Sequence, residues 1–118
     1  MLLKSRNRSG AAAENAAYKF LKRQGLKLVA KNYSCRFGEI DLLMQDKQQL
    51  VCVEVRYRGA NSYCHPLETI NKHKRSCLIK TAAYYMQSHD PDADLRFDVV
   101  AITENKDLDW IKHAFLVE

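Results

Sequence analysis

The chain has 118 residues, of which 47% are hydrophobic and 28% charged, with only four glycines and two prolines. This length and composition suit one globular domain over residues 1–118 and exclude disordered, collagen-like and low-complexity chains. No apolar run approaches the roughly 20 residues of a membrane span, and the basic start lacks the apolar core of a secretory signal. The four cysteines have no metal-site or disulfide spacing. We therefore expect a cytoplasmic protein without a membrane partner, with a flexible basic tail over residues 1–9.

The net charge of +5 is unevenly distributed along the chain. Residues 1–38 hold nine Lys or Arg against one acidic residue, a net charge of +8, whereas residues 39–118 hold ten against thirteen, a net charge of −3. A basic segment of this kind is typical of nucleic-acid-binding proteins. Lysine also serves solubility alone, so the charge leaves both interpretations open.

The hydrophobic pattern predicts seven elements: in chain order, a helix over 10–24, strands over 26–32, 39–44 and 50–57, a helix over 66–88, and strands over 95–103 and 110–117. Gly25 is expected to end the first helix and Pro66 to begin the second. The buried face of the first helix is predicted to hold Ala13, Ala16, Ala17, Phe20 and Leu21. This order predicts an α/β fold, a mixed central sheet flanked by helices.

The central hairpin, residues 38–57, carries the most informative pattern. A turn at 46–49 pairs residues whose numbers sum to 95, and this register stacks the apolar residues Ile40, Leu42 and Met44 over Val55, Val53 and Val51. On the other face it sets Asp41 opposite Glu54 and Glu39 opposite Arg56. Residues opposed in this way have Cβ atoms roughly 4.5–5.5 Å apart.

Two opposed carboxylates repel each other unless a cation or a proton lies between them. Carboxylate oxygens with room for waters are what Mg²⁺ prefers, and such an ion orients a water, lowers its pKa and neutralises phosphate charge. The alternative is an ordinary solvated face, on which Glu54 pairs with Arg58 and Glu39 with Arg56, each pair stabilising by about 0–1 kcal/mol. Leu43 on the same face favours a covered face.

Other polar residues border this predicted site. Glu14 falls at the edge of the buried face of the first helix, so it could reach the carboxylates, or it could instead complement the helix dipole. Arg36 and Arg58 are candidates for contacts with a nucleic-acid backbone.

Several motifs carry a family resemblance: GAAAE at 10–14, Asn32 and Tyr33, RFGEID at 36–41, VEVR at 53–56, Lys74, and RFDVV at 96–100. With these residues the chain resembles the YraN family of small bacterial proteins, which is similar to the restriction-endonuclease-like, or PD-(D/E)XK, nuclease superfamily. The glutamate of the first helix is also found in archaeal Holliday-junction resolvases. The resemblance implies an αβββαβ core, here with an extra C-terminal strand.

The resemblance also implies roles for individual residues. Asp41, Glu54 and the main-chain carbonyl of Val55 would bind Mg²⁺ or Mn²⁺, with Glu14 as an additional ligand. Position 56 would be catalytic, and three cations of the second helix would contact phosphate: Lys72, Lys74 and Arg75. Arg56 stands where the superfamily has lysine; arginine keeps its proton and cannot act as a general base, but it can donate to a phosphate oxygen.

The sequence thus predicts a nucleic-acid-binding protein that is a Mg²⁺- or Mn²⁺-dependent endonuclease. Its substrate would be DNA, including branched DNA, cleaved by a metal-activated water. Because of Arg56, the alternative is a non-cleaving nucleic-acid-binding module on a nuclease fold. A third interpretation is an adaptor with a solvated acidic face. RNA remains open as the partner, and a homodimer would suit a two-stranded substrate.

Overall fold

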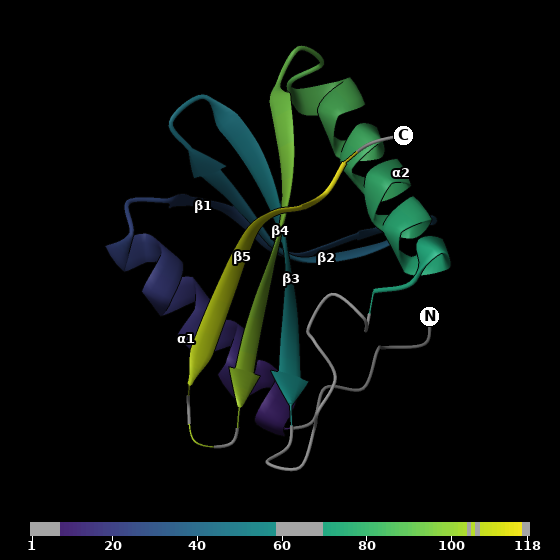
Figure 1. Cartoon of the computed structure of the whole chain (residues 1–118). Helices are drawn as coiled ribbons and strands as arrows, with labels where there is room; N and C mark the ends of the chain where they lie inside the picture. Colours follow the sequence, from purple (N-terminus) through teal and green to yellow (C-terminus); the bar gives the residue numbers. More distant parts are fainter. Residues whose placement is uncertain (1–7, 59–69, 104, 106, 117–118) are drawn as a thin grey trace.

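A computed structural model of the chain describes residues 8–58, 70–103, 105 and 107–116. It contains α1 (Arg8–Arg23), β1 (Lys27–Cys35), β2 (Gly38–Asp46), β3 (Gln49–Arg58), α2 (Lys72–His89), β4 (Asp94–Thr103) and β5 (Leu108–Phe115). The predicted order of two helices and five strands is confirmed (Figure 1). The basic tail was predicted two residues too long, because Arg8 and Ser9 already belong to α1; residues 1–7 lie outside the described part.

The five strands form one sheet in the order β1-β2-β3-β4-β5. β3 and β4 run parallel, with α2 as the connection between them, and the other neighbours are antiparallel. A parallel pair needs such a crossover, whereas antiparallel neighbours need only short turns. The predicted α/β fold with a mixed sheet is therefore confirmed, and β5 is the extra C-terminal strand.

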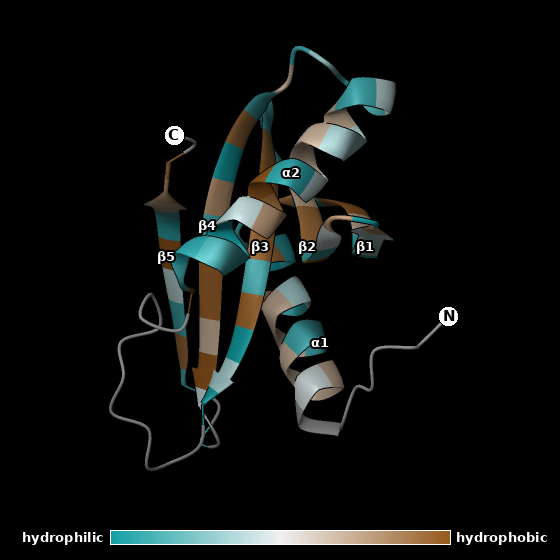
Figure 2. Cartoon of the chain, turned by 90° about the vertical axis from the view of Figure 1, so that its right-hand side faces the viewer, coloured by the Kyte–Doolittle hydropathy of each residue, from teal (hydrophilic) through white to brown (hydrophobic). Residues whose placement is uncertain are grey.

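The two helices cover opposite faces of the sheet, because alternate strand residues point to opposite sides. On one face, Ala13, Ala17 and Leu21 of α1 pack on a core that includes Leu42 and Val53. A second core, containing the buried residues Leu43, Cys52, Leu78 and Val99, lies beneath α2. Figure 2 shows the apolar residues of the strands in brown, between the two helices.

The predicted burial of Ala16 is wrong, because Ala16 is exposed. α1 contacts the sheet through a narrow stripe at every fourth residue, Ala13, Ala17 and Leu21, and Ala16 lies beside it. The helix ends as predicted. Gly25 has φ +98°, and the Leu26 N–H donates to the Leu21 carbonyl at 3.1 Å, a glycine-terminated helix end.

The start of α2 differs from the prediction. The helix begins at Lys72 and is capped by Asn71, whose Oδ1 accepts the Lys74 N–H at 2.8 Å. Ile70 is buried but not helical, so the predicted helical start at Pro66 is wrong for this part, and Pro66 itself lies outside the described residues. Neither helix is long and apolar enough, over its described residues, to span a membrane.

Candidate metal and nucleic-acid site

The predicted hairpin register is confirmed over part of its length. Paired residues run from Asp46 opposite Gln49 to Leu42 opposite Val53. The predicted face of Ile40 is wrong, because Ile40 packs in the core beneath α2 whereas Leu42 packs beneath α1. The pairing of β2 with β3 therefore ends at Leu42, next to Asp41, the first predicted metal ligand.

The Asp41 side chain occupies this divergence. Its Oδ2 accepts the Val55 N–H at 2.9 Å, a main-chain donor that ladder pairing would otherwise use. Gly38, with φ +151°, lies so close to α2 that an added Cβ would be 3.2 Å from Thr81 Oγ1. The start of β2 thus packs on α2, which explains both the glycine and the departure from β3. Asp41 is left 6% exposed, facing β3 with its carboxylate.

Glu54 is the second buried carboxylate and is 4% exposed. Its Oε2 lies 3.1 Å from Arg56 Nη2 and 3.6 Å from Lys74 Nζ. Arg56 comes from the same strand, and Lys74 from the first turn of α2, where the Asn71 cap fixes the backbone. β3 and α2 therefore bring two basic side chains to Glu54, and Asp41 of β2 bonds to Val55, the next residue along β3.

Glu14 is linked to the Asp41 segment of β2 through Asn32. The Asn32 amide donates to Glu14 Oε1 at 3.0 Å and to the main-chain oxygen of Asp41 at 3.4 Å. Asn32 has φ +51°, a left-handed conformation that asparagine tolerates better than most residues. No role for this residue was predicted from the sequence. The signal was present, since asparagine is disfavoured inside a strand.

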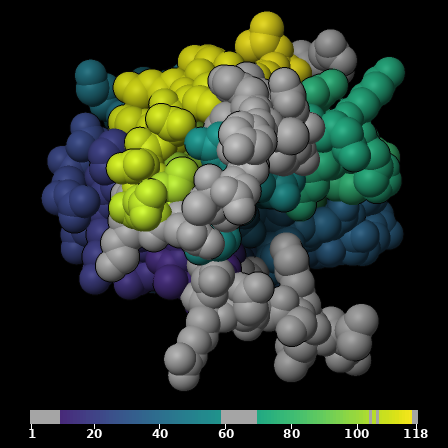
Figure 3. Space-filling model, turned by 60° about the horizontal axis from the view of Figure 1, so that its bottom comes forward, coloured from purple at the N-terminus to yellow at the C-terminus, as the bar shows by residue number. Residues whose placement is uncertain are grey.

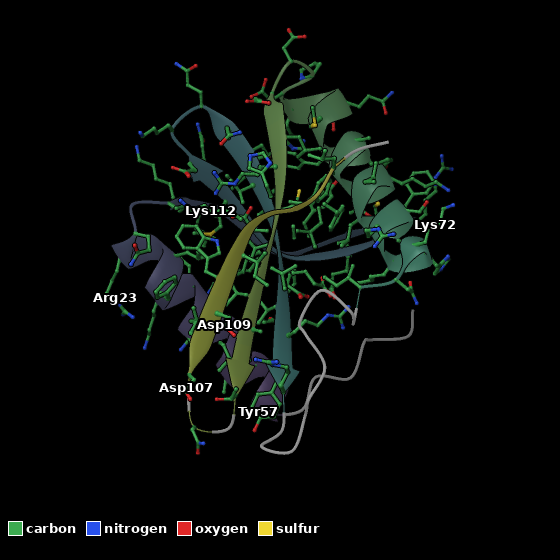
Figure 4. The ribbon with its side chains drawn as sticks, viewed as in Figure 1. Arg23, Tyr57, Lys72, Asp107, Asp109 and Lys112 are labelled. Atoms are coloured by element: carbon green, nitrogen blue, oxygen red, sulfur yellow. The ribbon has the colours of Figure 1, made fainter. Side chains whose placement is uncertain are left out.

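The remaining basic candidates on the strands lie elsewhere. Arg58, which the solvated alternative paired with Glu54, forms an ion pair with Asp109 of β5 at 3.4 Å. Arg36 is exposed in the turn before β2, with its guanidinium 4.8 Å from the Phe37 ring centre. In Figure 4, Asp109 lies on β5, across the sheet from α2.

Three further predicted residues have separate positions. Glu39 is half-buried at the start of β2, and Arg56 forms an ion pair with Glu54. Lys72 is exposed on the outer side of α2 (Figure 4). The Arg75 guanidinium donates to the Ile70 carbonyl at 3.2 Å. Of the three α2 cations predicted to contact phosphate, Lys74 is thus the one placed against the carboxylates.

The carboxylates of this site meet part of the requirement of a divalent ion. No three His, Cys, Asp or Glu side chains of the described residues gather closely enough to form a metal cluster, so Glu14 does not join Asp41 and Glu54 as one set. Mg²⁺ nevertheless uses only one or two carboxylates, keeps waters and takes substrate phosphates. Asp41, Glu54 and the Val55 carbonyl fit that requirement, and the two cations at Glu54 show that this position stabilises positive charge.

The surroundings favour an anionic ligand beside these carboxylates. In Figure 1, α1 begins near the lower end of β3, whereas α2 begins higher, at the right of the sheet, with Lys74 in its first turn; Figure 3 shows α1 and α2 on opposite sides of the lower end. A helix N-terminus carries a partial positive charge. This potential adds to the charges of Arg56 and Lys74.

The RFD segment at 96–98 lies away from the carboxylate site. Arg96 is 5% exposed and donates from Nε and Nη2 to the Asp98 carboxylate, at 2.9 Å each, and from Nη1 to Asp46 at 2.9 Å. Asp98 also accepts from Trp110 Nε1 at 2.9 Å and from the His113 N–H at 3.2 Å. Burial lowers the pKa of Arg96, but its hydrogen bonds and charge pairing with Asp98 and Asp46 outweigh burial and raise it. This buried cluster ties the hairpin turn to β4 and β5.

Comparison with known proteins gives consistent matches. A family model described as uncharacterised protein family UPF0102 matches residues 13–102. A UPF0102 protein of Coxiella burnetii is 44% identical over 111 residues, 92% of each chain. Similar proteins of Psychromonas ingrahamii and Nitrosomonas europaea are 43% and 42% identical over 115 residues, covering 97% and 96% of this chain and 94% and 98% of theirs. These names state a family and no activity.

Proposed function

The chain belongs to the UPF0102 family, and from its site we propose that it binds nucleic acid and hydrolyses phosphodiester bonds with Mg²⁺ or Mn²⁺. The observation that carries this proposal is that two cations from separate elements converge on the buried Glu54, while the buried Asp41 bonds to the N–H of the next residue, Val55. Asp41 and Glu54 lie where β2 leaves β3, and Arg56 and Lys74 converge on Glu54. Acidic groups for a divalent ion and basic groups for a phosphate are the two requirements of this chemistry.

The acidic side of the site would hold the ion. Asp41 and Glu54, with the Val55 carbonyl, are its proposed ligands. When bound, such an ion supplies Lewis-acid polarisation of a phosphoryl oxygen and a water of lowered pKa. The hydrogen bond from Val55 N–H holds the Asp41 carboxylate against β3. Asn32 fixes Glu14 beside the same segment of β2.

The basic side would hold the substrate. The Arg56 and Lys74 side chains are 29% and 31% exposed, so they can exchange a carboxylate partner for a phosphate without leaving a buried site. A guanidinium donates two parallel hydrogen bonds to phosphate oxygens. Because arginine keeps its proton, Arg56 stabilises charge in the transition state and accepts no proton from water.

We propose DNA, including branched DNA, as the substrate. The proposed contacts are with the phosphate backbone, and such contacts carry no sequence information. Selection would then follow the structure of the DNA. A second copy of the chain, supplying a second hydrolytic site, would suit a two-stranded substrate, and light scattering of the complex measures this.

One observation favours a second candidate, a nucleic-acid-binding module that does not cleave. Arg56 pairs with Glu54 at 3.1 Å and replaces the lysine of the nuclease superfamily. An arginine that stays on Glu54 would compete with a metal ion for that carboxylate. Binding without turnover is the result that this candidate predicts.

The test uses labelled single-stranded, duplex, flapped and four-way DNA with Mg²⁺, Mn²⁺ or EDTA. Asp41→Asn and Glu54→Gln remove the proposed ligands, and Asp92→Asn makes the same chemical change at an exposed position. Metal-dependent cleavage lost in the first two variants and kept in the third supports the proposal. Cleavage that survives in Asp41→Asn and Glu54→Gln contradicts it. Binding without cleavage supports the module, and no salt-sensitive binding supports the adaptor.

A further inference from the structure

The outer side of α2 contains a pocket of about 320 Å³ that is separate from the carboxylate site. Its described lining, which we call the α2 pocket, consists of Lys72, Arg75, Ser76, Ile79, Lys80 and Leu116. Three of these six residues are basic and none is acidic. The volume lies at the lower end of the range of about 300–1,000 Å³ that is typical of ligand pockets.

Helical spacing separates the pocket from the carboxylates. Lys72, Ser76 and Lys80 follow one another at intervals of four residues and therefore share a face of the helix. Lys74 lies on a different face and reaches Glu54. α2 thus divides its cations between two places: one ammonium at the proposed hydrolytic centre and three cations at the pocket.

The positive charge of the pocket is not neutralised by the described part of the protein. Within that part, no carboxylate lies at ion-pair distance from Lys72, Arg75 or Lys80. The first turn of α2 has no acidic residue, although negative charge there would complement the helix dipole. Arg75 is held in place by its bond to the Ile70 carbonyl. Two cations in the first turn of α2 and a third about two turns later fit an anionic ligand.

The lining also has an apolar part, which narrows the class of ligand. Ile79 and Leu116 stand beside the cations, and Leu116 is 71% exposed. A phosphate joined to a sugar would place its charge on the lysines and its less polar ring against these two side chains. Two apolar side chains offer little area to a lipid chain, so a lipid surface is less well matched.

We propose that the α2 pocket binds one phosphodiester unit of a nucleic-acid strand outside the hydrolytic centre. This inference rests on the proposed function and adds a second anchoring point to it. A strand held in the pocket and also at Lys74 is fixed in its position along α2. The pocket would then set which bond of a branched or single-stranded region reaches Asp41 and Glu54.

The test compares two double variants with equal change in charge. Lys72→Glu/Lys80→Glu alters the pocket; Lys47→Glu/Lys112→Glu alters exposed lysines of the hairpin turn and β5. A glutamate at position 72 complements the helix dipole, so the pocket variant is expected to fold, which circular dichroism checks. Fluorescence anisotropy with single-stranded and duplex oligonucleotides in EDTA measures binding without cleavage. We expect roughly 10-fold or greater weakening by the pocket variant, a salt slope reduced by about 1–2, and less than about 3-fold weakening by the control.

Other outcomes separate the alternatives. Equal weakening by both variants, or none by the pocket variant while the wild type binds, overturns the inference and leaves the proposed function standing. No binding by the wild type overturns both. A third outcome combines two results: deoxyadenosine monophosphate or inorganic phosphate shifts the Ser76 and Ile79 amide resonances, and the pocket variant keeps its affinity for oligonucleotides. This outcome contradicts the proposal and indicates a site for a free phosphate compound. Loss of binding to phosphatidylserine vesicles alone indicates a lipid surface and contradicts the proposal.

Discussion

Two clusters of acidic and basic side chains lie on the same sheet, and they differ in how firmly their cations are held. At the hairpin turn, Arg96 is 5% exposed and Asp98 is 1% exposed, and Asp98 accepts hydrogen bonds from Arg96, Trp110 and His113. At the candidate site, Glu54 is just as deeply buried, but Arg56 and Lys74 are each about 30% exposed.

This difference in the exposure of the cations shows that ion pairs of similar composition can either stabilise the fold or remain able to change partner. A buried cation cannot separate from its fixed partners without leaving an unpaired charge in the protein interior. The Arg96 cluster therefore holds β4, β5 and the hairpin together. Cations that reach water can change partner at little cost. The candidate site therefore has the mobility that exchange of a carboxylate for a phosphate requires.

The largest expected effect is loss of stability at the Arg96 cluster. Asp98→Asn removes the main charge partner of a buried guanidinium, so we expect the free energy of unfolding to fall by about 3–5 kcal/mol. Urea denaturation followed by circular dichroism measures this. In a double-mutant cycle, adding Arg96→Met should recover part of the loss, because no unpaired guanidinium then remains. A change below about 1 kcal/mol in Asp98→Asn would remove the proposed contrast between the clusters.

The second prediction applies the same kind of change to the candidate site. Glu54→Gln keeps the size of the side chain, and its two cations can turn to water, so the free energy of unfolding should change by less than about 1 kcal/mol. The rate of DNA cleavage should fall by about 100-fold or more. Single-turnover kinetics and denaturation of the same preparation measure both. If Glu54→Gln lost as much stability as Asp98→Asn, Glu54 would have a structural role like that of Asp98, and the prediction would be wrong.

The third prediction concerns Asn32 as a positioning residue. Asn32→Gly keeps the backbone at φ +51° without strain but removes the amide that joins Glu14 to β2. We expect roughly 10-fold slower cleavage and a higher Mn²⁺ concentration for half-maximal rate, with stability within about 1 kcal/mol. Lys47→Gly is the control, because Lys47 also has positive φ but lies in the hairpin turn. An unchanged Mn²⁺ dependence in Asn32→Gly would contradict this role.

The smallest expected effect is a pH dependence that reports on the firmly held cluster. Burial, and then the negative charge of Asp98, raise the pKa of the Cys52 thiol above its ordinary value of 9.0. The thiol ionises in the unfolded chain first, so stability present below pH 9 is lost as the pH rises, by about 1 kcal/mol between pH 9 and 10. Urea denaturation at pH 8, 9 and 10 measures this, and Cys52→Ala should flatten the slope. Cys35→Ala, at a half-buried thiol, is the control; equal slopes in all three proteins would contradict the prediction.

The sequence was most informative where structure depends on neighbours along the chain. Alternating apolar residues predicted the five strands along the chain, and the register that places Leu42 opposite Val53 followed from the same pattern. Gly25 marked the end of α1 through its backbone freedom. The acidic pair was predicted from an extension of the same register, but the pairing of β2 with β3 ends at Leu42 and Val53, before Asp41 and Glu54.

What the sequence did not predict depends on contacts between distant segments. The divergence of β2 at Asp41 follows from the packing of Gly38 against Thr81, more than forty residues away. The partners of Arg96 likewise come from Asp46 on another strand. Lys74 was assigned to phosphate by resemblance, but its place beside Glu54 depends on how α2 docks on the sheet.

The positive φ of Asn32 has a second consequence, which concerns the rim of the sheet. β1 and β5 are the outer strands, and each is irregular: pairing shifts between Leu28 and Ala30 on one side and between Phe97 and Val99 on the other. Such breaks make an outer strand a poor template for a strand of another molecule. The left-handed Asn32 adds a further irregularity to β1, so the residue whose amide bonds Glu14 also lies in an outer strand that is poorly suited to edge-to-edge aggregation.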